Sequence, residues 1–360
     1  MGENLSEGFD RALNFDKASS FNKATSFNRA LDKDAADLGV SPMFKQLRPR
    51  FDVHVFDSID STSTQLWRML AKGYGAGTVA IAYQQSAGRG QRGRSWQSLA
   101  GGLYLSLAIE PDWPVACAAQ LTCISAWGIA TALNNLGIPV RVKWPNDLFF
   151  EGKKLGGILT ETKLAYSSPT ASRQPNEPSS LPRIKQAVVG VGINWHNPIP
   201  ETGTSLVKIL KRFPNSPANI NINCLEMLAA LVLRGILQGV FYQKRVGSQV
   251  FMKGYEELLT QLGKPVSLDR NLLDQMIFSN EIQNSRSSKN LPSSAPLKAP
   301  TKEQLLSQLL NRSGEIVGLS EEGYLKVALR GPPVELPHWV NTPSEAAERV
   351  LLFAPTVLRF

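Results

Sequence analysis

A glycine- and arginine-rich loop between two strand-like runs places the strongest limit on how this chain folds. Residues 85–96 read Gln-Ser-Ala-Gly-Arg-Gly-Gln-Arg-Gly-Arg-Ser-Trp, and the flanking runs 78–83 and 103–109 have strand composition. Glycine lets backbone N–H groups approach a ligand closely, and arginine offers planar donors that fit carboxylates and phosphates. The loop therefore suits an anionic ligand, and a basic surface loop that is only solvated is the alternative.

Three further blocks place polar residues and glycines beside strand-like runs. Residues 143–147 read Lys-Trp-Pro-Asn-Asp, residues 153–161 read Lys-Lys-Leu-Gly-Gly-Ile-Leu-Thr-Glu, and residues 188–195 read Val-Val-Gly-Val-Gly-Ile-Asn-Trp. The proline of the first block ends regular strand pairing and forces a turn that presents Asn146 and Asp147. Asx residues in turns usually bond their own backbone, so a purely structural turn is the alternative to a ligand site.

In this order, these blocks resemble the catalytic domain of biotin protein ligases, also called biotin–acetyl-CoA-carboxylase ligases. The resemblance covers roughly residues 50–265, with a weaker similarity to about residue 330. It implies an α/β (α+β) fold in which helices pack on a mixed sheet, as in the class II synthetase-like biotin/lipoate ligase catalytic domain. A small C-terminal SH3-like β-barrel is expected to follow.

The N-terminal 50 residues differ in composition from the rest of the chain. A degenerate six-residue repeat begins at Phe15, Phe21 and Phe27, and it is too short for a repeat fold. Its composition predicts a disordered or partly helical tail over residues 1–50. Many biotin ligases carry an N-terminal helix-turn-helix that represses transcription, and no such pattern is present here. We therefore expect the form without the N-terminal DNA-binding repressor domain.

The remaining domain boundaries follow from the resemblance and from shifts in composition. The catalytic domain is expected over residues 51–262, with a Ser/Pro-rich flexible insertion at about 167–183. The SH3-like domain is expected over residues 263–335, interrupted by a flexible insertion at about 270–312, and residues 336–360 form a C-terminal extension.

Within the catalytic domain, patterning predicts the elements that carry the motifs. Residues 51–83 read as strand, helix, strand, and residues 115–136 read as a long buried helix. A hairpin is expected to join 148–150 to 155–161, and residues 222–259 are expected to form two helices with a break near Gly247.

The resemblance also implies which residues bind each ligand. Biotin is expected to contact Ser61, Thr62, Ser63, Gln85, Gly88, Arg89, Gly90, Gln91, Lys154, Gly156 and Gly157. The nucleotide is expected to contact Arg92, Arg94, Trp96, Lys143, Asn146, Asp147 and Asn194. Lys154 and Arg89 are the expected catalytic residues, and Asp147 is the expected Mg²⁺ ligand.

Several of these residues have a structural alternative. The hydroxyls of Ser61 to Ser63 would equally cap a helix, Trp96 could pack the loop, and Asn194 could hold the end of its strand. The family often has arginine after Gly90, and Gln91 at that position removes one positive charge.

The function implied is a two-step acyl transfer with ATP and biotin as substrates and Mg²⁺ as cofactor. Biotinyl-AMP would form first, and a lysine of the biotin carboxyl carrier protein of acetyl-CoA carboxylase would then take the biotinyl group. The three histidines (His54, His196, His338) are scattered, and the sequence shows no Ser-His-Asp or Cys-His pattern of a catalytic nucleophile. Lipoate or octanoate protein ligases or transferases share the fold, and they are the first alternative.

Net charge and cysteine use bound the remaining function classes. The 39 basic and 30 acidic residues give a formal net charge of +9, which favours an acidic partner or anionic ligands and leaves a nucleic-acid-binding module as a weaker alternative. The three cysteines lack metal spacing or evident pairing, which favours a reducing, cytoplasmic setting. No specific DNA partner and no membrane span are expected, and the protein is expected to be a monomer or homodimer.

Overall fold

The computed structural model of the 360-residue chain describes seven segments. They are residues 23–34, 36–44, 49–165, 182–276, 301–331, 350–354 and 358–359. By its internal contacts the chain divides into two compact units, Met1–Arg245 with Val357–Phe360, and Val246–Thr356. Most of the predicted insertion 167–183, and residues 277–300 of the predicted insertion 270–312, lie outside the described residues.

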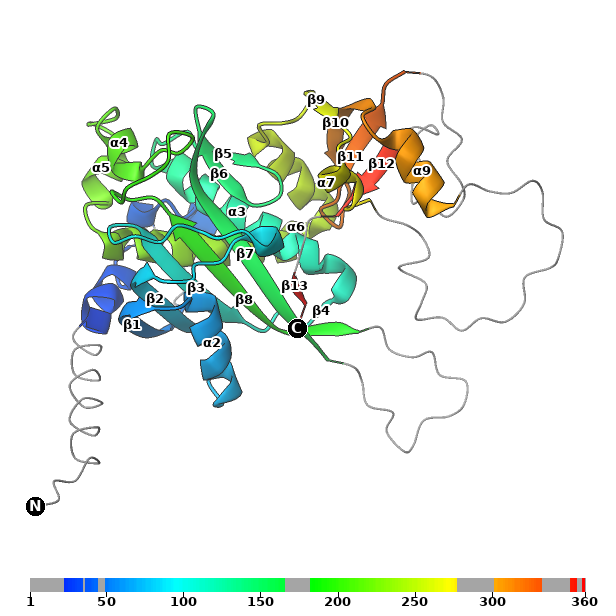
Figure 1. The fold of residues 1–360 in the computed structure, drawn as a ribbon. Helices are drawn as coiled ribbons and strands as arrows, with labels where there is room; N and C mark the ends of the chain where they lie inside the picture. Colours follow the sequence, from blue (N-terminus) through cyan, green and yellow to red (C-terminus); the bar gives the residue numbers. More distant parts are fainter. Residues whose placement is uncertain are drawn as a thin grey trace, which may run out of the picture. The chain divides into compact units, whose positions relative to one another are not determined.

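The larger unit is built on a mixed nine-stranded sheet (Figure 1). Its central path runs in the order β1-β2-β3-β8-β7-β6-β5, with β1 and β2 parallel and the other neighbours antiparallel. The strands on this path are β1 (Asp52–Ile59), β2 (Thr78–Gln85), β3 (Leu103–Ile109), β5 (Arg141–Lys143), β6 (Asp147–Phe150), β7 (Lys153–Ala165) and β8 (Arg183–Ile193). Two short strands pair beside it, β4 (Trp113–Pro114) with β8 and β13 (Leu358–Arg359) with β7. The mixed sheet predicted from the sequence is confirmed.

Helices cover both faces of this sheet, and adjacent residues of β7 show which helix lies on which face. The Thr160 hydroxyl is 2.9 Å from that of Thr122 on α3 (Ala118–Asn135). The next residue, Glu161, accepts a hydrogen bond from the indole of Trp67 on α2 (Thr62–Ala71). Since successive side chains of a strand point to opposite faces, α2 and α3 lie on opposite sides of the sheet.

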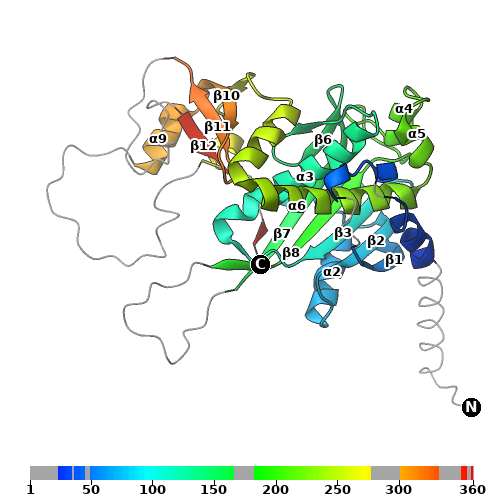
Figure 2. The same ribbon diagram turned by 180° about the vertical axis from the view of Figure 1, so that it is seen from behind.

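A long helix, α6 (Leu225–Leu258), packs against α3 at very close range (Figure 2). A Cβ atom added to Gly128 of α3 would lie 2.0 Å from the carbonyl oxygen of Gly235 on α6. The helix departs from helical geometry at Gly247 (φ 80°, ψ 167°), where a break was predicted. Length and composition would allow α6 to cross a membrane, but 67% of its most apolar window is buried inside the protein, which is typical of a core helix.

Part of the predicted N-terminal tail belongs to the folded unit. Residues 23–31 are helical, and the side chains of Phe27 and Leu38 are almost completely buried. Arg234 of α6 donates a hydrogen bond to the Leu31 carbonyl oxygen at 2.5 Å. Residues 23–34 and 36–44 therefore include a packed part of the unit, in which Val40 and Phe44 form an apolar cluster with Tyr242 of α6.

The smaller unit contains a four-stranded antiparallel sheet in the order β12-β11-β10-β9. Its strands are β9 (Pro265–Ser267), β10 (Ser313–Leu319), β11 (Leu325–Leu329) and β12 (Val350–Phe353). Two helices, α7 (Arg270–Leu273) and α9 (Lys302–Leu309), lie within the predicted insertion 270–312. β12 comes from the predicted extension 336–360, so the sheet draws on more of the chain than expected. The SH3-like barrel stays a prediction.

Candidate functional site

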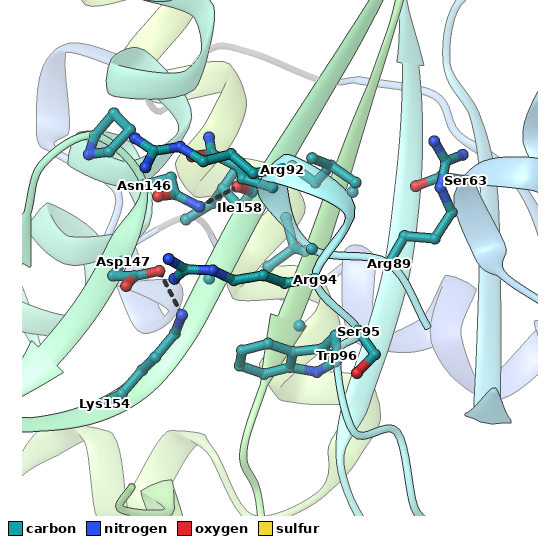
Figure 3. Close-up of a pocket in the computed structure, with 18 of the residues that line it drawn as sticks. Ser63, Arg89, Arg92, Arg94, Ser95, Trp96, Asn146, Asp147, Lys154 and Ile158 are labelled. Atoms are coloured by element: carbon teal, nitrogen blue, oxygen red, sulfur yellow. Dashed lines mark hydrogen bonds and ion pairs between the residues drawn. The ribbon is translucent and has the colours of Figure 1, made fainter. Parts of the chain in front are cut away.

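A cavity of about 240 Å³ in the larger unit collects residues from all the predicted motifs (Figure 3). Of the predicted site residues, those that line it are Ser61, Thr62, Ser63, Gln85, Arg89, Gly90, Gln91, Arg92, Arg94, Trp96, Lys143, Asn146, Asp147, Lys154 and Gly157. They come from the start of α2, the glycine–arginine loop, the turn between β5 and β6, and β7. Segments that are far apart in sequence therefore meet in one place.

Buried hydroxyl groups form one wall of the cavity. Ser63 Oγ lies 3.0 Å from Ser106 Oγ of β3, and Ser106 Oγ donates to Thr62 Oγ1 at 2.9 Å. Thr62 and Ser63 are both 4% exposed, so their polar atoms are largely removed from bulk water. Such a wall offers donors and acceptors to a polar ligand group.

The helix cap at this wall is supplied by Gln85 rather than by the predicted hydroxyls. Ser61 is the N-cap residue of α2, but its side chain makes no capping hydrogen bond. Gln85 Oε1 instead accepts the Thr62 backbone N–H at 2.7 Å, while its Nε2 donates to Ser98 Oγ at 2.7 Å. Gln85 therefore ties the start of α2 to the base of the glycine–arginine loop.

A β-bulge aims Lys154 into the cavity. β6 and β7 form a hairpin whose two-residue turn, Glu151 and Gly152, has positive φ at both positions. Leu148 pairs with Gly156, but Phe149 pairs with Lys154, so one extra residue of β7 lies opposite this step. The extra residue returns Lys154 to the face that Gly157 occupies, whereas an unbroken alternation would put it on the other face.

Lys154 and Asp147 form an ion pair at the centre of the site. Lys154 Nζ lies 2.6 Å from Asp147 Oδ1, and it also lies 5.1 Å from the ring centroid of Trp96. A Cβ atom added to Gly157 would lie 3.5 Å from Lys154 Nζ and 3.3 Å from Asp147 Oδ1. Because glycine has no side chain, this position leaves space on the cavity floor, beside the ion pair, for a ligand to approach.

Two further floor glycines, Gly190 and Gly192, were not among the residues predicted from the sequence. A Cβ atom on Gly190 would lie 2.7 Å from Ser63 Oγ, and one on Gly192 would lie 2.5 Å from Trp96 Nε1. Both line the cavity, and they pair with Leu159 and Gly157 of β7. The signal was the spacing of two glycines within a buried strand, which puts both on one face and commonly marks a close approach.

The cavity lining is strongly positive. It carries five cationic side chains and one carboxylate, that of Asp147. Figure 3 shows Arg94 and Lys154 both directed toward Asp147. Arg89 instead points toward Ser63, away from the Lys154–Asp147 pair, so the two expected catalytic cations are not placed side by side. The lining therefore favours an anionic ligand such as a polyphosphate or a carboxylate.

Arg89 contacts a carboxylate buried beside the cavity. Arg89 Nη2 lies 2.5 Å from Oε1 of Glu161, whose side chain is fully buried. Burial raises the pKa of the Glu161 carboxyl from its ordinary value of 4.5, while Arg89 and the Trp67 indole act in the opposite direction.

Comparison with known proteins identifies the domain that holds this cavity. The model of the biotin/lipoate A/B protein ligase family matches residues 55–170. The chain therefore carries a biotin/lipoate ligase domain. The bifunctional ligase/repressor BirA of Escherichia coli is 32% identical over 235 residues, which span 62% of this chain and 65% of that protein. The biotin–[acetyl-CoA-carboxylase] ligase of Paracoccus denitrificans is 33% identical over 138 residues, 38% of this chain and 51% of that ligase.

Other relatives are matched over a shorter share of their length. The Bacillus subtilis BirA is 32% identical over 140 residues, so the match spans only 38% of that protein. Among solved structures, a mutant of the Aquifex aeolicus biotin protein ligase in complex with biotin superposes with a TM-score of 0.51. It is 20% identical, and the match covers 84% of this chain and 95% of that chain. The structural match supports the fold of the ligase domain.

Three predicted site residues of the ligase domain do not line the cavity. A Cβ atom on Gly88 would lie 2.3 Å from the Trp96 carbonyl oxygen, and one on Gly156 would lie 2.7 Å from that of Gly192. Asn194 Nδ2 donates to the Thr204 carbonyl oxygen at 3.1 Å. The two glycines permit close backbone packing. Asn194 holds the end of its strand, which was the structural alternative to a nucleotide contact.

The turn between β5 and β6 is held to the sheet by Asn146. Its Nδ2 donates to the Ile158 carbonyl oxygen at 2.7 Å, and the Ile158 N–H donates to the Asn146 carbonyl oxygen at 3.0 Å. The side chain therefore bonds a neighbouring strand rather than its own backbone. This double contact fixes the position of Asp147, the next residue.

Proposed function

We propose that the ligase domain activates the carboxylate of biotin with ATP and transfers the biotinyl group to a lysine of a biotin carboxyl carrier protein. The carboxylate attacks the α-phosphorus, the bond to the β-phosphate breaks, and biotinyl-AMP and pyrophosphate form. A lysine amine then attacks the acyl carbon, releases AMP and loses a proton. The similarity to the Paracoccus denitrificans biotin–[acetyl-CoA-carboxylase] ligase supports this assignment.

The observation that carries the proposal is the convergence of cations and hydroxyls in one cavity. Biotin combines a neutral polar ring with a carboxylate, and ATP carries three phosphates. The buried hydroxyls at the start of α2 suit the neutral ring, and the cations near Asp147 suit the carboxylate and the phosphates. This division favours a biotin end and a nucleotide end within a single cavity.

Lys154 is proposed as the main catalytic cation. The first step brings two anions together, so catalysis depends on holding them in place and on stabilising charge at phosphorus. The side chain of Lys154 is 34% exposed and is aimed by the bulge in β7. Arg94 approaches the same region from the loop (Figure 3) and would add a second positive charge.

A magnesium ion fits the donor set only as an ion shared with phosphates. Within the described segments, no group of three His, Cys, Asp or Glu side chains could hold a metal. Mg²⁺ commonly takes one or two carboxylates together with substrate phosphates and waters, and Asp147 offers one carboxylate. We propose that Asp147 holds the ion, which would neutralise charge on the phosphate oxygens.

The test is ATP–pyrophosphate exchange with purified protein and Mg²⁺, adding biotin, lipoate or octanoate in separate reactions. Exchange that depends on biotin alone supports the proposal and identifies the acyl substrate. Exchange with lipoate or octanoate would instead assign the domain to the lipoate or octanoate ligases. No exchange with any of the three would contradict the proposal. Transfer is then measured with a purified carboxyl carrier domain and with the same domain lacking its acceptor lysine.

A further inference from the structure

Glu161 is a buried carboxylate whose contacts belong to two different elements. Its side chain is fully buried on β7, where Oε2 accepts the indole N–H of Trp67 at 3.1 Å. Oε1 lies 2.5 Å from Nη2 of Arg89 in the glycine–arginine loop. A buried carboxylate is costly unless it is paired and hydrogen-bonded, so filling space in the core does not account for a glutamate at this position.

The loop that carries Arg89 is tied to the rest of the unit at its start, where the Ser86 and Ala87 N–H groups donate to the carbonyl oxygens of Ile59 and Asp60 at 2.9 Å. The Trp96 N–H donates to the Gly88 carbonyl oxygen at 2.8 Å, and the Gly90 N–H donates to the Arg94 carbonyl oxygen at 2.7 Å. These two bonds lie within the loop and do not join it to β7 or α2. The contact between Arg89 and Glu161 joins this part of the loop to β7 and, through the Trp67 indole, to α2.

The orientation of Arg89 agrees with an anchoring role. Figure 3 shows its side chain turned toward Ser63 at the start of α2, away from the Lys154–Asp147 pair. The Arg89 side chain is 31% exposed at the cavity wall, whereas Arg92 and Arg94 at the loop tip are exposed. Arg89 thus lies where the loop meets the sheet.

We propose that Glu161 is a positioning residue that anchors the glycine–arginine loop over the cavity through Arg89, with Trp67 fixing the carboxylate. The anchor holds the loop backbone and Trp96 in place above the floor glycines. Its catalytic consequence rests on the proposed function, but the anchor itself is a property of the loop and is tested without substrate.

The first measurement is limited trypsinolysis, scored only at the bonds after Arg92 and Arg94. Glu161→Gln keeps the volume and an acceptor for Trp67 but removes the charge that pairs with Arg89. We expect it to raise the rate of cleavage at these bonds about tenfold or more, since a lost charge-assisted contact favours local opening. Trp67→Phe, which removes only the indole donor, should give a smaller increase.

Thr160→Val is the matched control. Thr160 is the neighbouring residue of β7, is 1% exposed, and loses a hydrogen bond on the opposite face of the sheet. It should leave loop cleavage at the wild-type rate even if it lowers global stability. Should Glu161→Gln fail to fold, Arg89→Gln breaks the same contact from the partly exposed side and should release the loop equally. Wild-type cleavage rates in a folded Glu161→Gln or Arg89→Gln protein would overturn the anchor.

The second measurement is a double-mutant cycle on biotin-dependent pyrophosphate exchange. Glu161→Gln should lower kcat/KM about tenfold in the wild-type background and have little further effect once Arg89 is replaced by Gln. Additive losses would show that Glu161 does not act through Arg89 and would overturn the positioning role. If the wild-type protein shows no exchange, the proposed function fails while the trypsin result still decides whether the anchor exists.

Discussion

Replacing Lys154 by alanine should separate catalysis from folding in this protein. The side chain approaches the cavity centre from a bulge in β7 and pairs with Asp147 at 2.6 Å. Loss of one positioned donor of this kind costs about 2.7–4 kcal/mol of activation free energy, or roughly 10²–10³ in rate. We therefore expect biotin-dependent pyrophosphate exchange to fall by about two to three orders of magnitude.

The cost of the same substitution to folding should be much smaller. The side chains of Lys154 and Asp147 are 34% and 22% exposed, so solvent screens their pair and its net contribution is about 0–1 kcal/mol. The contact of Lys154 with the Trp96 ring adds about 0.5–1 kcal/mol. A total of roughly 0.5–2 kcal/mol should appear as a modest shift of the urea midpoint with an unchanged slope.

Lys153→Ala is the control, since the preceding lysine is exposed on the same strand and does not line the cavity. It should retain exchange within about twofold of the wild-type rate, as surface substitutions away from a site usually have small effects. A folded Lys154→Ala protein that exchanges pyrophosphate within about threefold of wild type would refute the catalytic role of this lysine.

Three further predictions concern the cavity floor, the buried carboxylate and the helix contact. Gly192→Val should weaken the binding of biotin and ATP, measured by calorimetry, because its Cβ would lie 2.5 Å from Trp96 Nε1. Unchanged affinities would contradict the role of Gly192 in the floor of the cavity. Burial raises the pKa of Glu161, so the free energy of unfolding of the wild type, relative to that of Glu161→Gln, should fall as the pH rises above 4.5. Urea titrations measure both free energies, and a difference that grows with pH would contradict this prediction. Gly128→Ala should destabilise by about 1–3 kcal/mol, since its Cβ would lie 2.0 Å from a carbonyl oxygen of α6, whereas Gly75→Ala meets nothing within 4 Å and should change stability by under about 0.5 kcal/mol.

Much of the larger unit was predictable because its motifs lie at the ends of strands with clear composition. The strand, helix and strand expected over 51–83 correspond to β1, α2 and β2, and the break near Gly247 falls where it was expected. Local chemistry dictates such features, since glycine and proline restrict or release the backbone wherever they occur. The mixed sheet followed from the resemblance and is present.

The N-terminal segment shows where local composition is a poor guide to folding. Its apolar residues are sparse, so on composition alone it cannot bury enough surface to fold. Phe27 and Leu38 are nevertheless buried, and the segment packs on core helices: Val40 and Phe44 form a cluster with Tyr242 of α6, and Gly39 lies against Ala132 of α3. Burial that depends on a distant partner leaves no periodic signal in the segment that is buried.

The site itself marks the limit of prediction from motifs, because a motif names residues but not the direction of their side chains. Plain alternation along β7 would put Lys154 on the face opposite Gly157, and only the bulge opposite Leu148 returns it to the cavity. Arg89 is a second case, since the resemblance implied a biotin contact and a catalytic role but did not indicate that its guanidinium pairs with Glu161. Glu161 had no signal of its own, because a carboxylate that ends a strand motif looks solvated until the loop and α2 are placed over it. The residues that aim and anchor the site are therefore visible only once the register of β7 is known.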